Sequence, residues 1–141
     1  MLSGCWLNAR MNFSIEHLGL PARDPVVTKD WYVRTLDGKM IFTDGKTPPC
    51  FFVQLPGGVS LEIYKANSSL KETADNKLAG WRHVAVRVDS IEAARATLEQ
   101  RGVKFTTEVG SAGGGGRVLY FEDPDGNLLH LVERNADSKV R

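Results

Sequence analysis

Apolar and polar residues alternate along much of this chain with the period of a β-strand, and two segments carry the wider spacing of a helix. In the first half, this alternation predicts strands at about residues 13–20, 39–43, 50–55 and 59–64. In the second half, it predicts strands at about residues 81–88, 103–108, 117–122 and 127–133. A helix is expected after the first strand of each half, at residues 25–36 and 91–101.

Helix boundaries are marked by capping residues. Asp24 followed by Pro25 predicts a helix start, because proline is favoured at the first helical position and aspartate can accept hydrogen bonds from the exposed amides. Asp89 with Glu92 resembles a capping box at the start of the second helix. Gly102 is expected to end that helix.

Turn residues separate the strands. Gly57 and Gly58 predict a hairpin between the third and fourth strands, and the Asp-Pro-Asp-Gly sequence at 123–126 predicts a turn before the last strand. Residues 65–80 are expected to form a polar linker or lid, and residues 111–116 a glycine-rich hinge.

The two halves share the same order of elements, which indicates a duplicated βαβββ unit. We expect one domain at residues 12–134, with modules at about 13–65 and 81–134. Residues 1–11 are interpreted as a poorly ordered leader and residues 135–141 as a C-terminal tail.

Composition narrows the class of protein. The 141 residues are 42% hydrophobic and 25% charged, with a formal net charge of +1, so the chain lacks the basic field expected of a nucleic-acid-binding or anionic-membrane-binding protein. No apolar stretch approaches the ~20 residues of a membrane span. Cys5 and Cys50 form no CxxC pattern, and a cytoplasmic protein is expected.

All three histidines, His17, His83 and His130, lie in apolar, strand-like segments. His17 precedes Glu62 by 45 positions and His83 precedes His130 by 47, so these residues form two pairs, each about as long as one module. Buried imidazoles need partners for both nitrogens, and a shared metal ion is an economical one. The alternatives are core histidines bonded to backbone carbonyls and an exposed glutamate on a half-solvated sheet.

The sequences IEHLGLPARD, LEIY, WRHVAVRV and above all FEDPDGNLLHLVE resemble the vicinal oxygen chelate superfamily. The resemblance covers about residues 13–134. It implies an α+β fold in which two βαβββ modules form an open, cupped mixed sheet around a divalent metal ion. It also implies ligands from the first and fourth strands of each module, here His17, Glu62, His83 and His130, and a homodimer.

One position departs from the family pattern. Many members carry glutamate where this chain has His130, and Glu133 is expected to face the other side of its strand. Three imidazoles and one carboxylate favour zinc, nickel, iron, manganese or cobalt over magnesium or calcium. Catalytic roles are expected for Glu62, as the base, and for His130. Tyr64 and Arg87 are weaker candidates for contacts with the substrate.

The resemblance favours a metal-dependent enzyme of the glyoxalase I type, a lyase or isomerase whose small substrate is chelated through adjacent oxygens. Thiol transferase, epimerase and ring-cleaving dioxygenase chemistries belong to the same superfamily and stay open. The alternative from another class is a ligand-sequestering protein of the bleomycin-resistance type.

Overall fold

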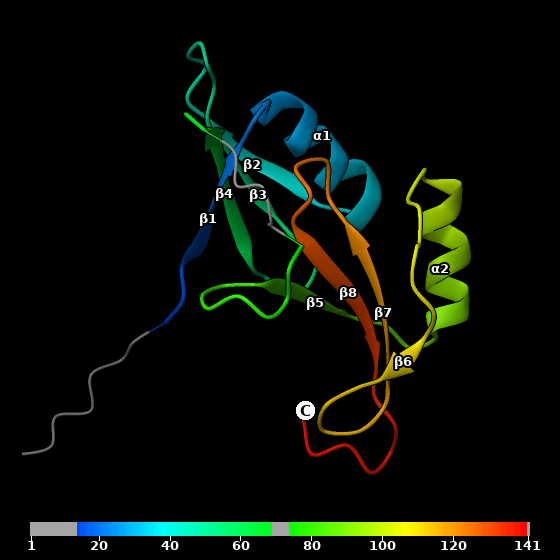
Figure 1. Cartoon of the computed structure of the whole chain (residues 1–141). Helices are drawn as coiled ribbons and strands as arrows, with labels where there is room; N and C mark the ends of the chain where they lie inside the picture. The colour runs from blue at the N-terminus through cyan, green and yellow to red at the C-terminus, as the bar shows by residue number, and fades with distance from the viewer. Residues whose placement is uncertain (1–13, 69–73, 141) are drawn as a thin grey trace, which may run out of the picture.

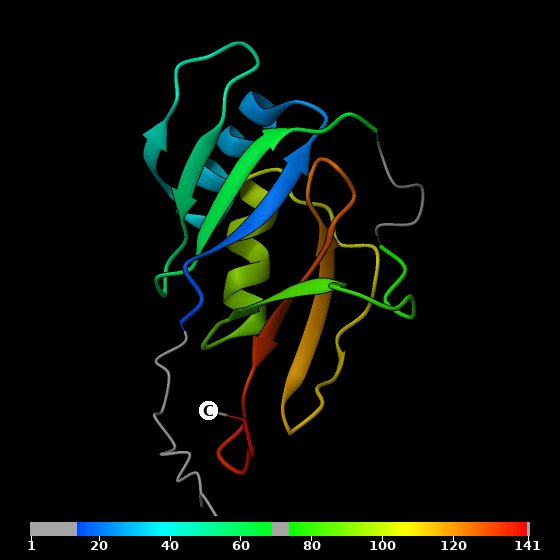
Figure 2. The ribbon, with the colours of Figure 1, turned by 90° about the vertical axis from the view of Figure 1, so that its left-hand side faces the viewer.

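The computed structural model describes residues 14–68 and 74–140, and it confirms two βαβββ modules. Each module has its own four-stranded mixed sheet with one helix against it, and the two sheets lie in separate parts of the molecule (Figures 1 and 2). The expected leader at residues 1–11 lies outside the described residues. Within the described part, neither helix has the length and apolar character needed to cross a membrane.

The first module has the strand order β1-β4-β3-β2, with β1 and β4 parallel and the other pairs antiparallel. Its elements are β1 (His17–Ala22), α1 (Pro25–Leu36), β2 (Lys39–Thr43), β3 (Phe51–Gln54) and β4 (Ser60–Lys65).

The second module repeats this topology with the order β5-β8-β7-β6, in which β5 and β8 are the parallel pair. Its elements are β5 (His83–Arg87), α2 (Ile91–Gln100), β6 (Gly110–Ser111), β7 (Arg117–Glu122) and β8 (Leu128–Glu133).

The expected strand at residues 103–108 is wrong. The corresponding element is β6, which pairs Gly110 and Ser111 with the start of β7. Val103 is buried and Phe105 packs against the core, so the apolar alternation there reflects burial of a loop rather than pairing with a neighbouring strand.

The N-cap of the second helix also differs from the expectation. Ser90, not Asp89, caps α2, and its side chain accepts a hydrogen bond from the amide of Ala93. In contrast, Asp24 caps α1 as expected, since its carboxylate accepts from the amides of Val26 and Val27.

Apolar side chains from both modules meet in one continuous core. Helix α1 packs on the first sheet through Tyr32 and Leu36, and α2 packs on the second through Ile91 and Leu98. In each sheet the face opposite the helix is therefore left to carry polar side chains.

The turn between β7 and β8 joins the two modules by reaching back to α1 (Figure 1). Asp123 is only 6% exposed and accepts from the Tyr32 hydroxyl at 2.9 Å. It also accepts from the backbone amides of Asp125 and Asn127 and from the Asn127 side chain, each at 2.9 Å. Burial, then the charge of Asp123, holds the pKa of Tyr32 well above its usual value, so the phenol stays a donor.

Asp125 extends this junction. Its carboxylate accepts from the Thr28 hydroxyl at 3.0 Å and from the Arg23 guanidinium at 2.7 Å. The Asp-Pro-Asp-Gly turn thus has a structural role, because it fixes the second module against the start of α1.

Replacing Asp123 with alanine should lower the free energy of unfolding by about 3 kcal/mol, because four buried donors lose their acceptor. Tyr32→Phe removes only one of these bonds and should cost about 1 kcal/mol. Urea denaturation followed by circular dichroism measures both. Equal losses in the two variants would contradict the view that the turn depends on Asp123 as a shared acceptor.

Candidate metal centre in two half-sites

The first half-site consists of His17 and Glu62 on neighbouring parallel strands. His17 is the first residue of β1, and Glu62 pairs with Gly19 two residues further along that strand. The His17 Nε2 atom lies 3.3 Å from Glu62 Oε2. Leu61 and Ile63, on either side of Glu62, are buried on the opposite face, which confirms the expected alternation.

Hydrogen bonding fixes the orientation of the His17 ring. Its Nδ1 atom contacts the carboxylate of Glu16. This contact, opposed by desolvation and supported by the charges of Glu16 and Glu62, raises the pKa of His17. The Nε2 atom is thereby turned toward Glu62.

Two further residues complete the surroundings of Glu62. Phe52, its antiparallel partner on β3, lies edge-to-face with the His17 ring at 5.3 Å between ring centroids. The Cys50 Sγ atom lies 3.9 Å from Glu62 Oε1, and burial, followed by the charge of Glu62, raises the pKa of this thiol. Neither the Phe52 contact nor the Cys50 contact was predicted from the sequence. The hairpin turn at Gly57 and Gly58 is the signal for the first, because it sets the register that pairs Phe52 with Glu62.

The second half-site consists of His83 and His130. His83 is the first residue of β5, and His130 pairs with Ala85 two residues further along. The two imidazole rings lie 4.7 Å apart between centroids, and the Tyr120 ring lies 5.1 Å from His130.

The histidines of the second half-site are also oriented through Nδ1. The Nδ1 atom of His83 lies 2.8 Å from the Asn76 side-chain oxygen, and that of His130 lies 3.2 Å from the Leu131 carbonyl. Burial lowers the pKa of His130, and the nearby His83 and Arg134 act in the same direction. His130 is therefore held as a neutral imidazole, the form that binds metals.

The two half-sites are equivalent in the duplicated fold. In each half-site, a histidine is the first residue of the module's first strand. The second candidate donor is the third residue of the module's fourth strand. It pairs with the residue two positions after the histidine, which is Gly19 in the first module and Ala85 in the second. A single chain does not bring the pairs together. Across residues 14–68 and 74–140, no group of three or more His, Cys, Asp or Glu side chains is placed to hold a metal ion.

Glu133 is directed away from the second half-site, as expected from alternation. Its carboxylate accepts from the Ile91 amide at 2.9 Å and from Arg117 at 2.7 Å, which ties β8 to the start of α2. Hydrogen bonding to the Ile91 amide and then to Arg117 lowers the pKa of Glu133. Glu133 therefore serves the fold, and His130 stays the candidate donor on β8.

The two weaker candidates are placed differently. Tyr64 lies on the same face as Glu62, with its ring over Gly19, and is 38% exposed. Arg87 shares a strand face with His83, but it donates a hydrogen bond to the Val140 carbonyl at 3.2 Å. Tyr64 thus borders the first half-site, whereas Arg87 holds the C-terminal segment.

The fold and its paired donor positions define a protein of two βαβββ modules with open mixed sheets. The chain belongs to the Glyoxalase/Bleomycin resistance protein/Dioxygenase superfamily, whose family model matches residues 14–131. This confirms the family that the sequence motifs indicate.

Similar proteins include an uncharacterized relative, a fosfomycin resistance protein and an antibiotic binding protein. The uncharacterized protein YaeR of Escherichia coli (strain K12) is 28% identical over 123 residues, covering 85% of this chain and 95% of its own. A variant of the fosfomycin resistance protein FosX from Listeria monocytogenes, in complex with Mn(II) and 1S,2S-dihydroxypropylphosphonic acid, has a TM-score of 0.71 at 21% identity, covering 93% of this chain and 98% of its own. TnmS3, an antibiotic binding protein from Streptomyces, has a TM-score of 0.65 at 24% identity, covering 89% and 99%.

Proposed function

We propose that this protein is a divalent-metal-dependent enzyme of the glyoxalase type that works as a homodimer. The observation that carries the proposal is the pair of equivalent half-sites, each with two donors and neither sufficient alone. A two-fold axis can bring the first half-site of one protomer to the second half-site of the other. Two complete sites then form in each dimer.

The donors fit a borderline divalent cation. Each complete site would contain His17 and Glu62 of one protomer with the partner's His83 and the partner's His130. Three neutral imidazoles and one carboxylate suit zinc, iron, nickel, manganese or cobalt. In all three rings Nδ1 contacts a protein oxygen, so Nε2 is the nitrogen that would face the metal; in His17 this atom already lies 3.3 Å from Glu62, the neighbouring proposed donor. Polarisation of two adjacent substrate oxygens is the chemistry that such an ion supplies when bound.

Glu62 is the proposed base. It is the carboxylate among the four donors, and one of its oxygens lies toward His17 while the other faces the Cys50 thiol. These contacts restrain the carboxylate, which we propose accepts a proton from a carbon next to the chelated oxygens. Phe52 packs against the His17 ring beside this position, and Tyr64 is the neighbouring group available to orient the substrate.

The histidine at position 130 argues against efficient lactoylglutathione lyase activity, because many superfamily members have glutamate there. A neutral imidazole bound to a cation is a poorer proton acceptor than a carboxylate released at the same position. We therefore propose a small substrate with adjacent oxygens other than the hemithioacetal of methylglyoxal and glutathione. Epimerase and thiol-transferase chemistry fit the same donors.

The second candidate is a ligand-sequestering protein. The similarity in fold to the antibiotic binding protein TnmS3 supports this candidate. A protein of that type does not need metal donors. The two matched pairs of donors therefore favour the enzyme.

Protein purified without chelator tests the proposal. We expect a dimer by multi-angle light scattering at micromolar concentration, with about one metal ion per chain by elemental analysis. Both the dimer and the bound metal are expected, because the four proposed donors come together only across two chains. A monomer would rule out shared sites, and a metal-free dimer would favour the sequestering protein.

A further inference from the structure

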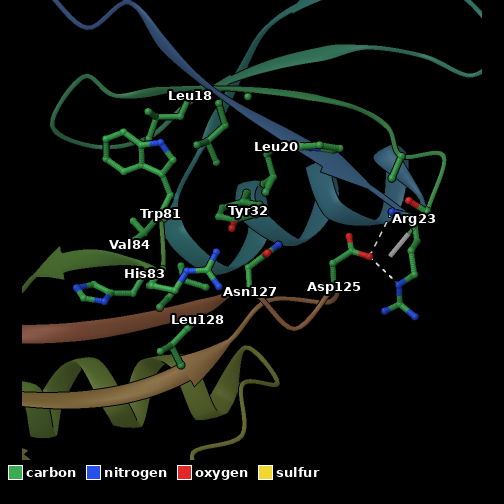
Figure 3. Close-up of a pocket in the computed structure, with 17 residues that line it drawn as sticks. Leu18, Leu20, Arg23, Tyr32, Trp81, His83, Val84, Asp125, Asn127 and Leu128 are labelled. Atoms are coloured by element: carbon green, nitrogen blue, oxygen red, sulfur yellow. Dashed lines mark hydrogen bonds and ion pairs between the residues drawn. The ribbon is translucent and has the colours of Figure 1, made fainter. Parts of the chain in front are cut away.

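A cavity lies between the modules, and the proposed donor His83 is one of the residues that line it (Figure 3). Its volume is about 470 Å³, within the range of small-molecule pockets. Strand alternation places the Val84 side chain on the opposite face of β5 from the His83 ring. Most of the wall is apolar and comes from β1, β4, β5 and β8: Leu18, Leu20, Leu61, Val84, Leu128 and Leu129.

One cation lining this cavity lacks a partner. The Nε atom of Arg82 is enclosed by the protein and donates to no acceptor within the described residues. No carboxylate in residues 14–68 or 74–140 forms an ion pair with its guanidinium. A buried donor without an acceptor is costly, and such groups in folded proteins usually mark a missing partner.

The other charged groups at the cavity are already paired. Asp125 is held by Arg23 and Thr28, as the dashed lines to Arg23 in Figure 3 show in part. Asn127 donates to Asp123. Among the described residues, no carboxylate therefore neutralises the positive charge that Arg82 places beside the apolar wall.

We propose that this cavity binds a small amphipathic carboxylate, with the carboxylate paired to Arg82 and the apolar body against the leucine wall. A guanidinium pairs with a carboxylate through two parallel hydrogen bonds, which the two terminal nitrogens of Arg82 can donate. Trp81, at the mouth, is 94% exposed and offers an apolar surface to the outer end of the ligand. The site borders the second half-site through His83, and it needs no metal.

Octanoate and octan-1-ol form a matched pair of probes, because they differ only in the charged head group. Isothermal titration calorimetry with chelator-treated, full-length protein should show octanoate binding about tenfold tighter than octan-1-ol. Arg82→Met should remove this preference and leave octan-1-ol binding unchanged. Leu18→Trp, which fills the cavity from β1, should weaken both ligands.

Arg34→Met is the control, since Arg34 is an exposed arginine on α1, and it should bind both probes like the wild type. Thermal unfolding of each variant verifies folding. The proposal is overturned if the wild-type protein binds neither probe. This result is expected if a second copy of the chain fills the cavity. An octanoate preference that persists in folded Arg82→Met also overturns it.

Discussion

Mixing His17→Ala and His83→Ala protein should restore about one quarter of the metal binding that each variant lacks. Each homodimer has two incomplete sites, because every site misses one imidazole. After co-refolding, half of the dimers are mixed, and each mixed dimer contains one site with both defects and one site with all four donors. Elemental analysis of the separated mixed dimer should therefore find about one metal ion per two chains.

The matched control combines His17→Ala with Glu62→Ala. Both changes lie in the first half-site, so no complete site forms in any dimer, and metal binding should stay absent. If the first mixture also fails to regain metal although mixed dimers form, the sites are not shared between chains. Stoichiometric metal in the His17→Ala/His83→Ala double variant would exclude these residues as ligands altogether.

Glu62→Gln should keep the metal ion and lose proton transfer by about 10²–10⁴-fold. The amide retains an oxygen donor and nearly the same shape, but it cannot accept a proton from carbon. Isomerisation of the hemithioacetal of methylglyoxal and glutathione, followed by absorbance, measures the change against a wild-type rate that we expect to be low. Glu108→Gln, an exposed carboxylate away from both half-sites, is the control.

The companion variant His130→Glu should raise this same activity, because it restores a carboxylate where many superfamily members have one. His130 sits in a buried position beside Tyr120 and His83, so the glutamate takes a place that is already shaped for a ligand. Rapid wild-type turnover of the hemithioacetal, unaffected by Glu62→Gln, would contradict both the base assignment and the role given to His130.

Much of the fold could be predicted from sequence because its signals are local. Strand alternation placed Glu62 on the face opposite Leu61 and Ile63, and Asp24 with Pro25 gave the start of α1. The errors occurred where local signals are ambiguous. Val103 and Phe105 alternate like a strand but are buried in a loop, since burial alone does not determine pairing.

The sequence alone determined the duplicated modules and the pairing of His17 with Glu62 and of His83 with His130, because equal intervals in a repeated unit reach equivalent positions. Only the tertiary structure showed that one chain holds these pairs as separate half-sites, since the placement of one module against the other depends on contacts far apart in sequence. The contact of Asp123 with Tyr32 is one such contact, and the cavity beside Arg82 is another consequence of that placement. No local sequence pattern predicts how the two modules are placed, because this placement arises from packing between two units that each have a complete set of strands and a helix.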